Sequence, residues 1–232
     1  ALQTGALFAG GVDSFFTLLG HREARDRAAS PSSDRVLCVW GFDIGLDSPE
    51  EYEKLRSRLS EAARESGTRL IDVATNLRDT RFRDAHWGRL AHGSALASIG
   101  LALERRVQTV YIAATYTGGT PIQPWGSHPE TDPLLSTGLT RIIHDNPGVS
   151  RFEKTQYVSR SDAAMRSLHV CPPARSSENC GDCRKCYLVL VTLDVLGALS
   201  RCSALSTRPR DPERVRRIAA KSEPCDCALS VY

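Results

Sequence analysis

Short apolar runs alternate with longer amphipathic segments over the first half of the chain. The apolar runs are typical of buried strands and cover residues 4–9, 35–40, 68–74 and 108–114. Apolar residues at helical intervals predict helices over residues 14–24, 47–67 and 89–105. This alternation favours an α/β fold with a mostly parallel sheet covered by helices on both faces. Ligands of such sheets bind at the carboxyl ends of the strands.

The second half of the chain has a different pattern. Residues 115–133 are rich in glycine, proline and polar side chains and are too long for a simple connection, so we expect a working loop. Further helices are predicted over residues 154–167 and 185–199, with a short surface helix over residues 212–221. We therefore divide the chain into an α/β domain, residues 1–145, and a C-terminal helical part, residues 146–232.

The composition excludes several classes of protein. With 232 residues, 41% of them hydrophobic, the chain is long enough to bury a substantial core. Its 30 basic and 27 acidic residues are mixed along the sequence, which argues against a dedicated nucleic-acid binder. Residues 1–8 lack the features of a signal peptide, and no apolar run approaches the length of a membrane span. We expect a cytoplasmic protein without a membrane partner.

Two glycines stand between the first predicted strand and the helix after it, in the stretch Ala9-Gly10-Gly11-Val12-Asp13-Ser14. Such a turn exposes consecutive main-chain N–H groups beside the positive end of a helix, which predicts an anion site. The stretch has neither the lysine of a Walker motif nor the G-x-G-x-x-G of a dinucleotide fold. The alternative is a plain turn in which Asp13 or Ser14 only caps the helix.

Four of the eight cysteines are close together in the sequence, with the spacing C-x8-C-x2-C-x2-C. They are Cys171, Cys180, Cys183 and Cys186. Four thiolates at this spacing suit a closed tetrahedral zinc site, which would be structural. The alternatives are an iron–sulfur cluster and a chance grouping of free thiols. Cys225 and Cys227, in the tail, are too close in sequence for an easy disulfide.

The stretch from Ala9 to Ser14 resembles the S-G-G-x-D-S signature of the PP-loop, or N-type, ATP pyrophosphatases, with Ala9 in place of the first serine. The resemblance implies a fold of the HUP, or adenine-nucleotide alpha-hydrolase-like, class. It implies that Gly10, Gly11, Asp13 and Ser14 bind the β,γ-pyrophosphate of ATP, that Ala9 and Val12 belong to the same loop, and that Asp13 helps to hold Mg²⁺. A substrate oxygen then attacks the α-phosphate, which gives an adenylated intermediate and pyrophosphate.

Other residues are candidates for the same site. The resemblance places adenine and ribose near the end of the second strand, at Trp40 and Asp43, although an aromatic residue there is equally expected in the core. His92 on the third helix is expected to face the same crevice, with a structural role as its alternative. In the long loop, His128, Glu130 and Asp132 are candidates for orienting a nucleophile, or else ordinary loop polar residues.

A PP-loop followed by this cysteine spacing is similar to the 7-cyano-7-deazaguanine synthase family and its paralogues. The resemblance implies structural zinc, a homodimer and a lysine at the position of Lys154. It also implies an ATP-dependent ligase that activates a small-molecule carboxylate, adds ammonia and activates the resulting amide again to give a nitrile. The loop around residues 124–138 departs from that family, so we expect a different carboxylate or amide. The alternatives are a PP-loop sulfur transferase acting on a nucleobase or tRNA, and a non-catalytic, zinc-stabilised nucleotide-binding protein.

Overall fold

A computed structural model describes residues 3–28, 35–115, 125–171 and 176–205, together with residues 213 and 216. In this part of the chain the strands are β1 (Thr4–Leu7), β2 (Arg35–Trp40), β3 (Arg69–Ala74), β4 (Thr109–Ala113) and β5 (Arg141–Asp145). The α-helices are α1 (Val12–Ala28), α2 (Pro49–Glu65), α3 (His92–Ala102), α4 (Arg151–Val158), α5 (Asp162–Ser167) and α6 (Arg184–Val195). Of the predicted tail helix, residues 212–221, only residues 213 and 216 are described, and both are helical; Cys225 and Cys227 lie outside the described residues.

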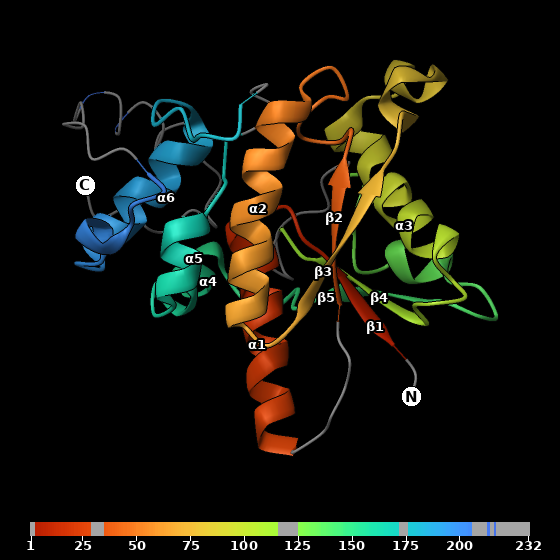
Figure 1. Cartoon of the computed structure of the whole chain (residues 1–232), viewed down its shortest axis with the longest axis horizontal. Coiled ribbons are helices and arrows are strands. Elements are labelled where there is room, and N and C mark those ends of the chain that lie inside the picture. The colour runs from red at the N-terminus through yellow and green to blue at the C-terminus, as the bar shows by residue number, and fades with distance from the viewer. Residues whose placement is uncertain are drawn as a thin grey trace.

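The five strands form one sheet in the order β3-β2-β1-β4-β5, and every neighbouring pair is parallel. Helices α1 and α2 lie on one side of this sheet and α3 lies on the other (Figure 1). Successive strand residues point to opposite faces, so Ala6 and Val36 pack toward α1 and α2 while Leu7 and Leu37 pack toward α3. This confirms the predicted α/β fold with a parallel sheet between two helical layers.

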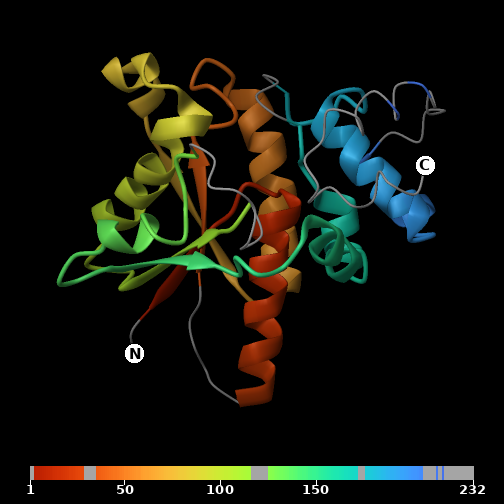
Figure 2. The same ribbon diagram turned by 180° about the vertical axis from the view of Figure 1, so that it is seen from behind.

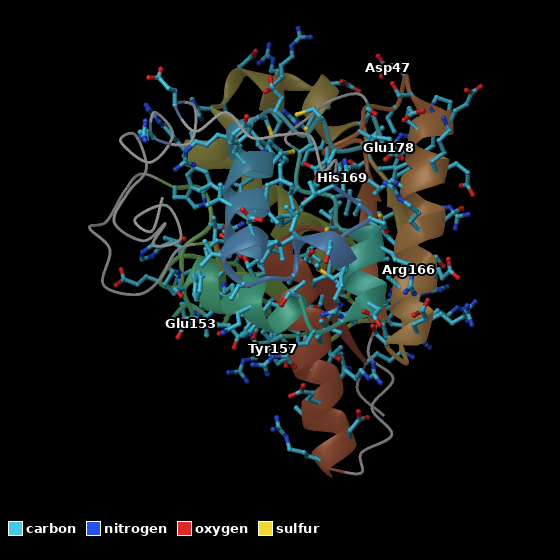
Figure 3. All side chains as sticks on the ribbon, turned by 90° about the vertical axis from the view of Figure 1, so that its left-hand side faces the viewer. Asp47, Glu153, Tyr157, Arg166, His169 and Glu178 are labelled. Carbon is cyan, nitrogen blue, oxygen red and sulfur yellow. The ribbon has the colours of Figure 1, made fainter. Side chains whose placement is uncertain are left out.

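The C-terminal helices form a further layer on the outer side of α1 and α2, which is seen from behind in Figure 2. Their apolar residues, such as Met165 and Leu193, belong to the same hydrophobic cluster as Phe15 of α1 and Leu59 of α2. Polar contacts also join the layers, since Arg166 of α5 binds the Glu65 carboxylate of α2 at 2.9 Å (Figure 3). Helices α4 to α6 are therefore fixed against the sheet-bearing part through α1 and α2.

The C-terminal helices differ from the prediction in their boundaries. The helix expected over residues 154–167 is two helices, because Ser161 leaves the helical conformation and accepts a hydrogen bond from the N–H of Ala164 as the cap of α5. Helix α4 starts earlier, at a capping box made by Ser150 and Glu153. Helix α6 ends at Val195, ahead of Gly197 with its φ of 65°.

Strand β5 was missing from the prediction.

In the part of the chain that the structure describes, no helix has both the length and the apolar character needed to cross a bilayer.

Candidate active site and metal centre

The turn between β1 and α1 contains the two glycines that the sequence singles out. Gly10 has a φ of 79°, in the left-handed region that favours glycine. A Cβ at this position would lie 2.7 Å from Cδ2 of Leu59 on α2. The carbonyl oxygen of Gly10 accepts a hydrogen bond from the main-chain N–H of His169 at 2.8 Å. The turn is therefore held closely between α2 and the segment that leads to the cysteine cluster.

Helix α1 begins directly after this turn, at Val12. The Ser14 hydroxyl and the N–H of Phe15 both donate to the carbonyl oxygen of Gly11, each at 3.0 Å. The first N–H groups of an α-helix have no carbonyl partner within the helix, and with the helix dipole they attract anions. Because β2 and β4 lie on opposite sides of β1, the turn is at the point where the strand order reverses, where open α/β sheets bind ligands.

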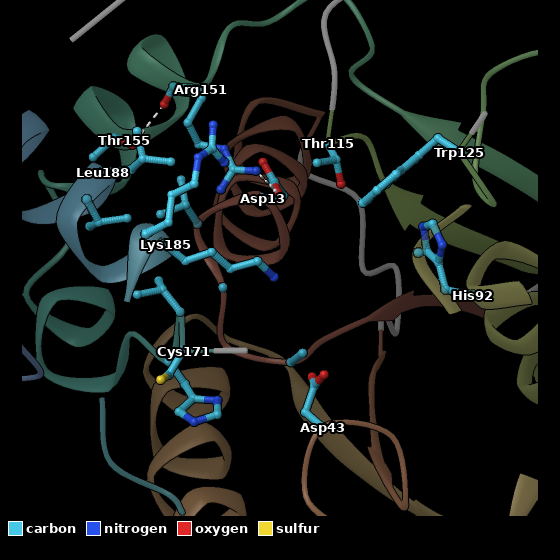
Figure 4. Close-up of a pocket in the computed structure, with 18 of the residues that line it drawn as sticks. Asp13, Asp43, His92, Thr115, Trp125, Arg151, Thr155, Cys171, Lys185 and Leu188 are labelled. Carbon is cyan, nitrogen blue, oxygen red and sulfur yellow. Dashed lines mark hydrogen bonds and ion pairs between the residues drawn. The ribbon is translucent and has the colours of Figure 1, made fainter. Parts of the chain in front are cut away.

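A cavity of about 570 Å³ opens in front of the turn (Figure 4). The turn forms one wall, and residues of α4, α6, α3 and the segment before the cysteine cluster form the others. Of the predicted site residues, those that line this cavity are Ala9, Gly11, Val12, Asp13, Asp43, His92 and Cys171. The structure thus brings residues of the glycine turn and of the cysteine cluster to one cavity, although they are far apart in the sequence.

A second cavity of about 240 Å³ shares the turn with the first and also includes Ser14 in its lining. It is bounded mainly by apolar side chains from the ends of the strands and from α3, among them Phe42, whose ring lies 5.2 Å from that of Trp87. Asp43 lines both cavities. Trp40 instead stacks on Tyr52 at 5.1 Å and donates its indole N–H to the carbonyl oxygen of Gly45 at 2.9 Å.

Asp13 is the centre of the charged network at the turn. Its Oδ2 lies 2.8 Å from Nη2 of Arg151, the first residue of α4, and its Oδ1 lies 3.6 Å from Nζ of Lys154. This Oδ1 is buried and has no hydrogen-bond partner among the described residues. The Asp13 carboxylate thus lies between two cationic side chains of α4.

Lys154 lies behind Asp13 and is 1% exposed. Its ammonium group donates to the carbonyl oxygen of Ala114 at the end of β4, at 2.6 Å. Burial lowers the pKa of Lys154, and the nearby Asp13 carboxylate partly opposes this shift. Lys154 is absent from the described linings of both cavities, so its charge acts on the site through Asp13.

The four cysteines of the cluster come together as the spacing predicts. All four Sγ atoms lie within 4.8 Å of one another, which suits coordination of one metal ion. Sγ of Cys180 accepts hydrogen bonds from the N–H groups of Asp182 and Cys183, at 3.4 and 3.2 Å, and Sγ of Cys183 accepts one from the N–H of Cys186 at 3.5 Å. These N–H groups stabilise thiolates, so a four-thiolate set compatible with zinc is preorganised.

Asn179 fixes the cluster to the rest of the fold. Its side-chain oxygen accepts hydrogen bonds from the N–H groups of Val170 and Cys171, and its NH₂ group donates to the carbonyl oxygens of Leu168 and Ala204. The same segment carries His169, whose main chain binds the glycine turn. The metal centre and the turn are therefore joined by a short, fully hydrogen-bonded stretch of chain.

The histidine of the third helix and the three candidates in the long loop have different positions. His92 lines both cavities, its Nδ1 lies 3.2 Å from the carbonyl oxygen of Trp87, and burial lowers its pKa. Asp132 is fully buried and binds Ser127 Oγ and His144 Nδ1 at 2.6 and 2.7 Å. Ser127, Asp132 and His144 thus hold the end of the long loop in place. None of the three loop candidates appears in the described lining of either cavity, that is, His128, Glu130 and Asp132.

Several cavity residues were missed by the reading of the sequence, namely Arg151, Arg184, Lys185, Trp87 and Trp125. Arg151, Arg184 and Lys185 stand in the first turns of α4 and α6. A basic residue at the start of a helix opposes the helix dipole, and this unfavourable placement was the signal available in the sequence. Comparison of the sequence with protein-family models and with curated proteins found no match.

Proposed function

We propose that this chain is an AMP-forming PP-loop enzyme that uses ATP to adenylate a carboxylate or amide of a small molecule and then transfers nitrogen to it. The observation that carries the proposal is the glycine turn at the strand-order reversal, opening into a charged cavity on one side and an apolar cavity on the other. A nucleoside triphosphate has the matching halves, an anionic polyphosphate and a flat apolar base.

The residues around the turn divide the work of binding ATP. The N–H groups at the start of α1 donate hydrogen bonds to phosphate oxygens, and Asp13 orients the Arg151 guanidinium toward the same cavity. Phe42 and Trp87 offer apolar surface for the base, and Asp43, on the border of the two cavities, is placed for ribose hydroxyls. Mg²⁺ bound with the phosphates would neutralise charge at the α-phosphate as the acceptor oxygen attacks it.

The reaction proposed for the acceptor balances without an oxidant or reductant. An acceptor carboxylate oxygen forms a bond to the α-phosphorus and pyrophosphate leaves. Ammonia then attacks the acyl carbon, AMP leaves, a proton is lost and an amide remains. A second adenylation, on the amide oxygen, releases another pyrophosphate, and loss of AMP and of both amide N–H protons would then give a nitrile. In this scheme the zinc that we assign to the four cysteines holds the cavity wall and takes no part in the bond changes.

The test is mass spectrometry of zinc-loaded protein incubated with ATP, Mg²⁺, ammonium and 7-carboxy-7-deazaguanine, followed by a panel of other aromatic and aliphatic acids. The expected result is formation of AMP and pyrophosphate that depends on the acid, together with a product in which the acid oxygen is replaced by nitrogen. Asp13→Asn should lower the rate of AMP formation by about 100-fold or more, as loss of a preorganised charged group at a reacting phosphate does. Asp84→Asn, at an exposed acid, is the matched control.

Other outcomes point to the other functions considered. Bound iron, with sulfur transfer to a nucleobase or tRNA, would replace the proposal with a sulfur transferase. ATP binding without AMP formation for every acid tested would favour a nucleotide-binding protein without catalysis. A homodimer in the cytoplasm remains our prediction for the assembly and its location, and gel filtration coupled to light scattering tests the first part.

A further inference from the structure

The cavity wall opposite the glycine turn is formed by the first turn of α6. Arg184 and Lys185 stand there between two cysteines of the cluster, Cys183 and Cys186, and both line the cavity. Cys183 is the N-cap of α6, and its Sγ accepts a hydrogen bond from the N–H of Cys186. The main chain of this turn is thus fixed at both ends by the metal centre.

Lys185 extends from this turn into the cavity, toward the region between Asp13 and Asp43 (Figure 4). Its side chain is exposed, and no carboxylate among the described residues lies within ion-pair distance of its ammonium group. The Lys185 charge also contributes to lowering the pKa of His92, on the far wall, after the larger effect of burial. The ammonium group therefore lies in the cavity without a carboxylate partner among the described residues.

The charges around Lys185 favour an anionic occupant. Asp13 is already paired with Arg151 at 2.8 Å, and Lys154 is buried behind it. The glycine turn itself has no lysine at the position where a Walker loop places one, and Ala9 supplies no hydroxyl. A polyphosphate on the N–H groups of α1 would therefore face Lys185 as the cation from the opposite wall.

We propose that Lys185 is a phosphate-binding residue, and that its ammonium group binds phosphate oxygens of the nucleotide held at the glycine turn. The inference rests on the proposed function for the identity of the ligand. The helix that carries the metal centre would thus supply a charge that the phosphate loop lacks, and the metal site would fix the position of that charge.

The test is titration calorimetry of zinc-loaded protein with magnesium pyrophosphate and, separately, with ATP and Mg²⁺. We expect Lys185→Met to raise the Kd for both ligands roughly tenfold, the factor for one charge-assisted hydrogen bond. Lys185→Arg, which keeps the charge, should stay within about threefold of the wild type. Arg64→Met is the matched control, because Arg64 is an exposed cation on α2 whose nearest acidic partner is Glu61 at 3.8 Å. Zinc content and melting temperature establish that each variant is folded and loaded.

Three results would overturn the inference: Lys185→Met binding both ligands as tightly as the wild type, Arg64→Met weakening binding equally, or wild-type protein binding neither ligand. Failure of the proposed function is separate, because pyrophosphate binding requires no adenylation. Weaker pyrophosphate binding by Lys185→Met, with no AMP formed from any acid, supports the phosphate site and refutes the enzyme. AMP formation by the wild type, with pyrophosphate and ATP binding unchanged in Lys185→Met, supports the enzyme and refutes the role of Lys185 in phosphate binding.

Discussion

Replacing Gly10 with alanine tests how tightly the glycine turn is enclosed. Gly10 has a φ of 79°, and the new Cβ would lie 2.7 Å from Cδ2 of Leu59, a fully buried side chain of α2. Two penalties should therefore add. The left-handed backbone costs an alanine about 1–2 kcal/mol, and displacement of a packed core side chain costs about 1–3 kcal/mol more.

Gly67 provides a control in which the two penalties are separated. It has a φ of 69° after α2, and a Cβ there would meet nothing within 4 Å. Gly67→Ala should lower the free energy of unfolding by about 1 kcal/mol, from the backbone alone. Gly10→Ala should lower the free energy of unfolding by about 2–5 kcal/mol, and the difference between the two variants measures the close approach to Leu59.

The assay is urea unfolding of zinc-loaded protein, followed by circular dichroism at 222 nm. In the double variant Gly10→Ala/Leu59→Ala the clashing atoms are gone, so the added cost of the alanine at position 10 should fall to about that at Gly67. Equal destabilisation by Gly10→Ala and Gly67→Ala in the wild-type background would refute the argument that α2 encloses the turn.

Three further predictions concern the four-cysteine cluster, His92 and the hydrogen bonds of the Asn179 side chain. Cys180→Ser should be purified with little zinc, because it removes one of the four thiolates. The control Cys202→Ser, at a buried cysteine outside the cluster, should keep one equivalent of zinc. Full zinc content in Cys180→Ser would exclude the four-cysteine site. Burial lowers the pKa of His92 in the folded protein, so the unfolded chain binds more protons and the free energy of unfolding should fall as the pH drops from 7.5 to 5.5. The fall should be smaller in His92→Gln. Identical pH dependence of the two proteins would argue against a buried, neutral His92. Asn179→Ala removes four hydrogen bonds and should lower the free energy of unfolding in urea by about 2–4 kcal/mol. A loss below about 0.5 kcal/mol would contradict the view that Asn179 fixes the cysteine cluster to the fold.

The sheet was largely predictable because its inner strands are buried on both faces. A strand such as Arg35–Trp40 is then a continuous apolar run that stands out from its neighbours. Strand β5, Arg141–Asp145, was missed because it is an edge strand with only two apolar residues, Ile142 and Ile143, and with His144 and Asp145 only partly buried. Strand β3, at the other edge, is also partly exposed but carries four apolar residues, so the short apolar run of β5 rather than its edge position alone weakens the signal.

The candidate site divides in the same way between local and distant contacts. The glycine turn and the four cysteines were predictable because each depends on residues within about 16 positions of one another. The approach of Arg151 and Lys185 to the turn depends instead on how α4 packs against α1 and how α6 packs against α4. A pattern of apolar positions reports that a helix has a buried face and does not report which distant segment covers it. Lys154 illustrates the same limit, since its motif drew attention to it but packing placed it behind Asp13.

The hydrogen bond between Gly10 and His169 has a consequence for the chain during its synthesis. Residues 9–13 leave the ribosome well ahead of Val189, which belongs to the other wall of the larger cavity. At about 5–20 residues per second, on the order of ten seconds or more separate the two. Throughout that interval the emerging turn lacks the partner that later closes over it, and Leu59 and the apolar face of α2 await α5. The larger cavity is therefore complete only when almost all of the described chain has been made, and until then its apolar walls are exposed in the nascent chain, where such surfaces promote aggregation.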